Sequence, residues 1–381
     1  MTRSTGAWLP GDPPGHRQFL TLGKLLALDS GRTLGDVRIA YETWGRLDER
    51  ATNAVLLCHA WTGDSHVTGP AGRGHPAPGW WEGMIGPGRP IDTNRWFVVC
   101  ANVLGGCQGS TGPPSPNPAD GRPYGSRFPV VTIRDMVRAQ ARLADALGID
   151  VWHAVIGGSM GGMQALEWAI MYPPRVRSII PIAACMQATA QQIAWSAIGR
   201  RAIALDPHWH GGDYYDADRG PDEGLAIARM VAQVTFRSDN VFTDRFGRGL
   251  VEGLSDRFGL WQQFEVETYL DHHGAKLVRR FDANSYLVIG KAMDLHDVAR
   301  GRGSVAGAMA RVRAACLNIG ISSDLLYPNY QQRQIDEILR SEGVASRYLE
   351  VESPHGHDAF LINLDQLADP IAEFLDQVSE R

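Results

Sequence analysis

A serine set among glycines is the strongest indication of chemistry in this sequence. Gly157, Gly158, Ser159, Met160 and Gly161 fit the pattern Gly-x-Ser-x-Gly, which places a serine nucleophile on a sharp turn between a strand and a helix. A β-rich apolar run precedes the motif and a helical pattern follows it, as the motif requires. Small residues on either side leave room for the turn to close. We therefore predict Ser159 as a nucleophile rather than an incidental serine in a glycine-rich turn.

An aspartate far along the chain is placed where an activating acid would be expected. A serine hydroxyl becomes a good nucleophile when a histidine takes its proton and an acid orients that histidine. On the fold that carries this motif, the chain order is serine, acid, histidine. Asp324 follows the apolar run 315–321, so at the end of a strand it would face the same sheet edge as Ser159. Capping of a helix is its alternative role.

Two histidines compete for the role of the base. His355 and His357 stand close together in a loop with proline and glycine, after the apolar run 347–351. Their spacing does not separate them, so both remain candidates on this evidence. Three further histidines lie before or beside the nucleophile, which is the wrong order for the base: His59, His66 and His153.

Backbone amides are expected to stabilise the oxyanion of an acyl-transfer intermediate. Met160, directly after the nucleophile, supplies one N–H donor. The second is expected from the loop after an early strand, at residues 58–62, and we predict Trp61.

Other chemistries find little support. The sequence has no P-loop, no Gly-x-Gly-x-x-Gly and no His-Glu-x-x-His motif, and its five cysteines show no Cys-x-x-Cys spacing. Asp294, His296 and Asp297 suggest metal ligands, but such charges on a helix are usually solvated. We predict neither a metal site nor a bound cofactor.

The hydrophobic pattern indicates an α/β fold. Continuous apolar runs predict strands buried on both faces, as in a mostly parallel sheet. These runs are 54–58, 97–102, 151–156, 176–182, 315–321 and 346–351. Helical patterns at 133–147, 160–171 and 364–378 alternate with them, which is typical of βαβ units.

The character of the sequence changes twice along the chain. Residues 1–18 are rich in glycine, proline and polar residues, which predicts a flexible N-terminal tail. From 186 to 296 the pattern is mostly helical, with few strand candidates. We therefore predict an α/β core at 19–185 and 297–381, interrupted by a helical lid insertion at 186–296.

Composition excludes several kinds of partner. The 381 residues are 44% hydrophobic and 21% charged, as in ordinary globular proteins. A formal net charge of -5, with lysines and arginines scattered, predicts binding neither to nucleic acid nor to a membrane surface. No signal peptide and no membrane-spanning run are recognisable, so we predict a cytoplasmic protein.

Six segments together resemble the homoserine O-acetyltransferase family, acyltransferases on the α/β-hydrolase fold. The segments are HAWTGDSHVTGP, NVLGGCQGSTGP, GSRFPVVTIRDMV, GGSMGGMQALEWA, GISSDLLYP and GHDAFL, and the resemblance runs from about residue 20 to about residue 375. It implies a catalytic triad of Ser159, Asp324 and His357, with His355 as a neighbour. The implied donor is acetyl-CoA, the implied acceptor homoserine and the implied pathway methionine biosynthesis, in a homodimer.

The resemblance also implies where the acceptor binds. Homoserine would lie between Arg229 and Asp358, since a guanidinium binds an α-carboxylate and a carboxylate accepts from an α-ammonium group. One departure is visible, because the family often has a tyrosine where this chain has Phe236. Alternatives from the same fold are a homoserine O-succinyltransferase, a serine O-acyltransferase and an esterase, and from outside enzymology a catalytically inactive binding module.

Overall fold

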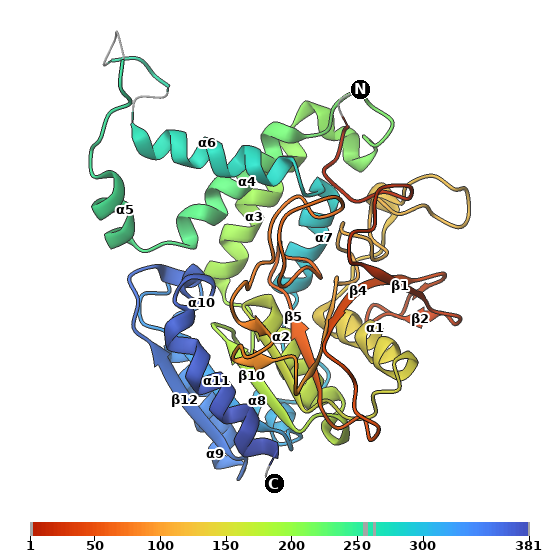
Figure 1. The fold of residues 1–381 in the computed structure, drawn as a ribbon. Coiled ribbons are helices and arrows are strands. Elements are labelled where there is room, and N and C mark those ends of the chain that lie inside the picture. The colour runs from red at the N-terminus through yellow and green to blue at the C-terminus, as the bar shows by residue number, and fades with distance from the viewer. Residues whose placement is uncertain (1–2, 254–257, 262–263, 380–381) are drawn as a thin grey trace.

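An eight-stranded sheet forms the centre of the computed structural model, which describes residues 3–253, 258–261 and 264–379. The strand order is β1-β4-β8-β5-β9-β10-β11-β12 (Figure 1). In chain order the strands are β1 (Gln18–Thr21), β4 (Arg38–Trp44), β5 (Ala54–Cys58), β8 (Phe97–Ala101), β9 (Ala154–Gly158), β10 (Ser178–Ile182), β11 (Ala315–Ile321) and β12 (Ser346–Val351). Two small pairs lie outside this sheet: β2 (Leu26–Ala27) with β3 (Thr33–Leu34), and β6 (Ile85–Gly86) with β7 (Ile91–Asp92).

The sheet is mostly parallel, as the sequence predicted. The strands from β8 to β12 in the sheet order run parallel, whereas β1 and β4 pair antiparallel at one edge. Strand β5 shows why its sequence is continuously apolar. Val55 and Leu57 pack into one hydrophobic cluster, and Leu56 and Cys58 pack into another on the opposite face. Successive side chains of a strand alternate in direction, so a strand between two layers needs apolar residues throughout.

Helices cover both faces of the sheet. Side chains of α1, α2 and α9 pack into one cluster, and side chains of α11 pack into the other. Their bounds, with those of two short helices, are α1 (Ile133–Ala146), α2 (Met160–Met171), α8 (Val305–Met309), α9 (Tyr330–Ser341), α10 (Ala359–Ile362) and α11 (Leu364–Ser379). Helix α1 begins where it does because Thr132 and Asp135 form a capping box.

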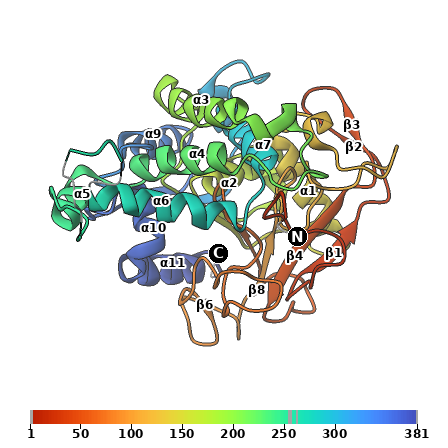
Figure 2. The ribbon, with the colours of Figure 1, turned by 90° about the horizontal axis from the view of Figure 1, so that it is seen from above.

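The segment predicted as a lid contains the helices that lie above the sheet in Figure 1. They are α3 (Ala190–Leu205), α4 (Asp222–Thr235), α5 (Asp239–Phe246), α6 (Glu265–Val278) and α7 (Ala283–Asp294). Figure 2 shows α3, α4 and α6 running side by side, and α4 contacts both of its neighbours. These helices cover the edge of the sheet at which the predicted site residues lie.

The N-terminal segment differs from the tail expected at 1–18. Its described part, residues 3–17, packs against the rest of the protein. Ala7 is buried, and the backbone N–H of Trp8 donates to the carbonyl of Cys107 at 2.9 Å. The glycines and prolines here lie in a packed, irregular segment whose backbone groups form hydrogen bonds. The prediction of a flexible tail from composition was therefore wrong for the described residues.

Among the described helices, none is both long and apolar enough to cross a bilayer. The five cysteines are buried as free thiols, and the pKa of the Cys58 thiol is raised because burial disfavours the thiolate.

Candidate active site

Ser159 lies on a strained turn between β9 and α2. Its backbone has φ 57° and ψ −121°, in the positive-φ region that non-glycine residues rarely adopt. A Cβ on Gly161 would lie 2.0 Å from the carbonyl oxygen of Cys58, and one on Gly157 would lie 2.5 Å from the backbone of Gly161. The flanking glycines are therefore required by close backbone contacts. Such strain, on the order of 1–3 kcal/mol, is typical of functional sites.

The structure brings His357 and Asp324 together, 33 residues apart in the chain. Nδ1 of His357 donates to Oδ2 of Asp324 at 2.7 Å, and both residues are buried. The other carboxylate oxygen accepts from the backbone N–H groups of Leu326 and Tyr327, each at 2.8 Å. Because the carboxylate fixes the proton on Nδ1, Nε2 is left as a bare acceptor that can act as a base.

Between the two candidate histidines, the structure favours His357. His357 lines the same cavity as Ser159, whereas His355 is absent from the described residues that line it. The backbone N–H of His355 instead donates to Oγ of Ser353. The 3-10 turn Gly356–Asp358, directly before helix α10, carries His357 to the cavity.

Nearby negative charges raise the pKa of His357 above the value that burial alone would give it. Burial lowers its pKa, but the charge and hydrogen bond of Asp324, with a contribution from Asp358, outweigh that effect and raise the pKa above its ordinary value. The ring also packs on aromatic neighbours, 5.0 Å from the ring of Tyr327 and 5.6 Å from that of Phe360 between centroids.

Tyr327 was not predicted from the sequence. It is buried and lines the cavity, and it lies three residues after Asp324 within GISSDLLYP. Burial raises the pKa of its phenol well above the ordinary value, while a hydrogen bond with Ser159 acts in the opposite direction. The phenol and the nucleophile thus line the same cavity. Only its position in the folded site reveals this, since a tyrosine after a strand has no distinctive sequence signal.

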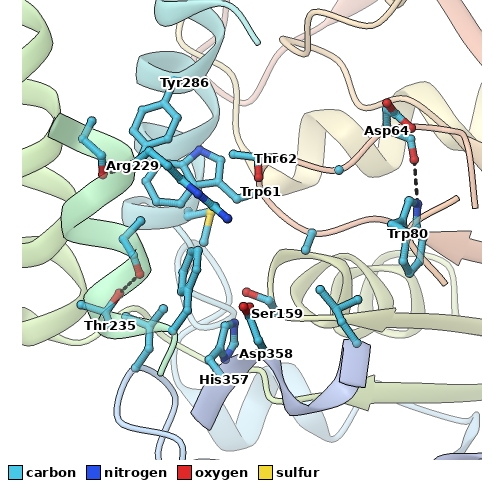
Figure 3. A pocket seen from close by; sticks show the side chains of 18 of the residues that line it. Trp61, Thr62, Asp64, Trp80, Ser159, Arg229, Thr235, Tyr286, His357 and Asp358 are labelled. Carbon is cyan, nitrogen blue, oxygen red and sulfur yellow. Dashed lines mark hydrogen bonds between the residues drawn. The ribbon is translucent and has the colours of Figure 1, made fainter. Parts of the chain in front are cut away.

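A cavity of about 250 Å³ unites these groups. In Figure 3, Ser159, His357 and Asp358 lie together on its lower side, and Arg229 projects toward it from α4 beside Trp61 and Tyr286. The lid helices and the sheet edge thus share one enclosed space.

The two residues expected to hold an amino acid both line this cavity, but they do not pair with each other. Arg229 is half-buried and forms no ion pair with an acid among the described residues. Burial lowers its pKa, against the opposing charge of Asp358. Asp358 instead forms an ion pair with Arg237 at 3.2 Å, a partner that the sequence did not suggest. The arrangement leaves one guanidinium available for a carboxylate.

Phe236 occupies the space between these groups. Its ring centroid is 5.8 Å from that of His357, and Cζ of Arg229 lies 5.2 Å from the Phe236 ring centroid. The aromatic ring that the family often carries as a tyrosine is thus present here as a packing surface, without a hydroxyl group.

The two amides predicted for an oxyanion hole are available as donors. Within the described residues, neither the backbone N–H of Met160 nor that of Trp61 donates to another protein group. Met160 is the first residue of α2, where backbone N–H groups point out of the helix. The ring of Trp61 stacks on Tyr286 with centroids 4.2 Å apart, which holds the loop against α7.

Glu42, His66 and His75 form a buried cluster with the side chains of a metal site. The two histidines also line the cavity. Nδ1 of His66 lies 3.0 Å from Oε2 of Glu42. The two imidazole rings, however, are stacked with centroids 3.8 Å apart and planes at 12°, so their lone pairs do not converge on one point. In addition, Nε2 of His75 accepts from the backbone N–H of His16. The geometry fits a hydrogen-bonded cluster better than an ion site.

The three residues considered as metal ligands at 294–297 each have a different partner. Asp294 pairs with Arg200, and a ring nitrogen of His296 lies 3.0 Å from the carbonyl oxygen of Cys185. Oδ1 of Asp297 accepts from the side chain of Gln187.

The sequence is similar to a known fold family and to known enzymes. A family model described as alpha/beta hydrolase fold matches residues 53–364. Homoserine O-acetyltransferase from Thermobifida fusca (strain YX) is 54% identical over 377 residues, covering 98% of this chain and 97% of that protein.

Solved structures are similar over most of the chain. Homoserine O-acetyltransferase from Bacillus anthracis has a TM-score of 0.88 and 32% identity, covering 94% of this chain and 97% of that one. Esterase E22 has a TM-score of 0.86 and 30% identity, covering 94% of this chain and 99% of that one. Neighbours with this fold thus carry names of both transferases and hydrolases.

Proposed function

Because the chain belongs to the homoserine O-acetyltransferase family of α/β-hydrolase-fold enzymes, we propose that it acetylates the side-chain hydroxyl of L-homoserine, with acetyl-CoA as donor. The product would serve methionine biosynthesis. The observation that carries the proposal is the pairing of His357 with Asp324 beside Ser159, in a cavity that also contains the guanidinium of Arg229.

The first half of the reaction loads the enzyme. Nε2 of His357 takes the proton of Ser159, and Oγ attacks the thioester carbonyl carbon of acetyl-CoA. The amides of Met160 and Trp61 stabilise the resulting oxyanion, whose negative charge forms only during the reaction. As the C–S bond breaks, the imidazolium returns the proton to the CoA thiolate. Free CoA leaves, and an acetyl ester remains on Ser159.

The second half transfers the acetyl group to the acceptor. His357 takes the proton of the homoserine hydroxyl, whose oxygen attacks the ester carbonyl. The bond from the acetyl carbon to Oγ of Ser159 then breaks, and the proton returns to Ser159. The product is O-acetylhomoserine, and the enzyme is restored to its starting state.

Positioning of the acceptor follows from the charges in the cavity. Arg229 offers a planar guanidinium to the α-carboxylate. Asp358 accepts from the α-ammonium group while it keeps its ion pair with Arg237. Holding the amino acid by two charges directs its side-chain hydroxyl, rather than water, toward the acetyl ester.

A hydrolase is the second candidate, favoured by the similarity to esterase E22. Ser159, His357 and Asp324 can transfer an acyl group to water as readily as to an alcohol, so these three residues alone do not choose the acceptor. Arg229 and Asp358 favour an acceptor that carries both a carboxylate and an ammonium group.

Steady-state release of CoA, with mass spectrometry of the product, tests this proposal. We expect CoA release from acetyl-CoA to require homoserine and to yield O-acetylhomoserine. Competition with succinyl-CoA and with serine tests for the two related transferases. Equal release with and without homoserine would support an esterase instead.

Replacing Arg229 should impair acceptance of homoserine more than loading of the enzyme. We expect R229A to lower kcat/KM for homoserine roughly 100-fold, about 2.8 kcal/mol, because the acceptor carboxylate loses its charged partner. Rapid-quench measurement of acetyl-enzyme formation should show a nearly unchanged first half-reaction. R201A, which removes an exposed arginine of α3 outside the cavity lining, is the matched control. Equal losses in both half-reactions would contradict the assigned role.

A further inference from the structure

Two cations beyond Arg229 line the same cavity, and the acceptor does not need them. Lys276 lies near the end of α6 and is exposed, whereas Arg280, just after that helix, is half-buried. Neither forms an ion pair with an acid in the part of the chain that the structure describes. An amino-acid acceptor has one carboxylate, which Arg229 can satisfy. The remaining positive charge thus points to a second, anionic ligand.

Acids among the described lining residues offset only part of this positive charge. Three aspartates line the cavity, but Asp294 is paired with Arg200 and Asp358 with Arg237. Asp64 is left as the remaining carboxylate among the described lining residues.

The pKa of a nearby histidine also indicates that positive charge surrounds this part of α6. His273, on α6, has its pKa lowered to about 4, first by burial and then by positive neighbours that include Arg229 and Lys276. The side of the cavity formed by α6 therefore favours negative charge.

The position of these cations separates them from the reacting atoms. Exposure increases from half-buried Arg229 to exposed Lys276, so Lys276 lies where the cavity meets solvent. Arg280 spans from the lid to the loop after β5, because its Nη1 donates to the carbonyl of Thr62 at 2.7 Å. Its guanidinium thus has a fixed position with further N–H groups to offer.

Part of the cavity lining is apolar. It is formed by the loop before β6 and by helix α10, through Pro76, Pro78, Trp80 and Leu361. Pro76 and Pro78 are exposed, while Trp80 is half-buried and fixed by its indole N–H, which donates to the carbonyl of Asp64 at 3.0 Å (Figure 3). An uncharged, flexible chain can lie along such a wall.

We propose that Lys276 and Arg280 bind the phosphate groups of the acyl-CoA donor, while its pantetheine arm passes along Pro76, Pro78 and Trp80 toward Ser159. This inference rests on the proposed function, since it takes acyl-CoA as the donor. An acyl-CoA has a thioester at one end of an uncharged arm and phosphates at the other. The cavity offers the matching surfaces: a buried nucleophile, apolar lining residues and two cations, of which Lys276 is exposed to solvent. Arg and Lys are the usual partners of phosphate groups.

Kinetics with three donors tests the assignment. The donors are acetyl-CoA, acetyl-dephospho-CoA, which lacks the 3′-phosphate, and acetyl-pantetheine, which lacks all phosphates. We expect K276A and R280A each to raise KM for acetyl-CoA about 5-fold, and the double variant about 20-fold, as for charge-assisted hydrogen bonds near solvent. With acetyl-pantetheine the variants should equal the wild type. A loss that persists with acetyl-dephospho-CoA assigns the cations to the diphosphate, and one that disappears assigns them to the 3′-phosphate.

The matched control is R279A, which removes an exposed arginine beside Arg280 that is not among the described cavity-lining residues. Its KM for acetyl-CoA should stay at the wild-type value. Ionic strength gives a further readout, because added salt should raise KM for acetyl-CoA in the wild type and much less in the double variant.

Two results would overturn the phosphate site. One is an unchanged KM for acetyl-CoA in the double variant. The other is an equal loss with acetyl-pantetheine, which would show that Arg280 merely holds the Thr62 loop. Failure of the proposed function is distinguishable, since it would appear as a wild type without homoserine-dependent CoA release. Calorimetric titration with CoA alone would then still compare the wild type with the double variant, and equal affinities would again reject the site.

Discussion

S159A is expected to abolish acetyl transfer almost completely, with kcat falling on the order of 10⁶-fold. The oxygen that forms the acetyl ester is absent in this variant, so the remaining groups can only polarise acetyl-CoA and position homoserine. CoA release measured with homoserine present checks the rate. Mass spectrometry of the intact protein after mixing with acetyl-CoA should show a mass increase of one acetyl group in the wild type and none in the variant.

The control for S159A is an intact fold and intact substrate binding. Serine and alanine differ by one oxygen, and the strained backbone at this position is fixed by contacts of the neighbouring glycines. We expect the variant to keep its affinity for CoA in calorimetry. A variant that still transferred acetyl groups within about tenfold of the wild-type rate would exclude a covalent route through residue 159, where tenfold corresponds to about 1.4 kcal/mol of barrier.

D324N should have the second largest effect, a fall in kcat of about 10⁴-fold. The amide is almost the same size as the carboxylate, but it has no negative charge to stabilise the imidazolium of His357. Its NH₂ group also competes for the position from which the carboxylate now accepts the Nδ1 proton. The imidazole is then held in the wrong tautomer, with Nε2 protonated and unable to act as a base.

The pH dependence of D324N distinguishes this role from loss of structure. In the wild type Asp324 contributes to a raised pKa of His357, so activity should fall as the pH drops through that value and the base becomes protonated. Without the carboxylate, burial remains and lowers the pKa. The acidic limb of the residual kcat/KM profile should therefore move to lower pH. An unchanged limb would contradict the assignment of His357 as the titrating base, and D336N, at a second buried aspartate outside the cavity lining, is the control.

The sequence by itself determined much of the sheet and the nucleophile. The runs at 54–58, 315–321 and 346–351 and the helix at 160–171 have the bounds that the structure gives them. β5 and β11 are buried on both faces and are therefore almost continuously apolar, which makes them easy to recognise. The turn at Ser159 is equally local, because its glycines are required by contacts between β9, α2 and the end of β5.

Strand β1, at one edge of the sheet, was harder to recognise than β12 at the other edge. β1 is mostly exposed and lacks a continuous apolar run, so its sequence does not differ from that of a loop. The packed segment at 3–17 was missed for a related reason. Its long-range hydrogen-bond partners lie between 57 and 277 residues away in the chain, and local composition does not report them.

Only the tertiary structure decided which side chains meet in the cavity. The spacing of His355 and His357 did not separate them, and the choice of His357 rested on the resemblance to the family. In the structure, the turn at Gly356–Asp358 presents His357 to the cavity, and His355 is not among the described lining residues. The ion pair of Asp358 with Arg237 joins residues from separate elements. The cavity likewise brings Tyr327 beside Ser159, and Lys276 and Arg280 beside the loop after β5. Their meeting depends on how the lid helices pack over the sheet edge, a long-range arrangement that neither periodicity nor short motifs encode.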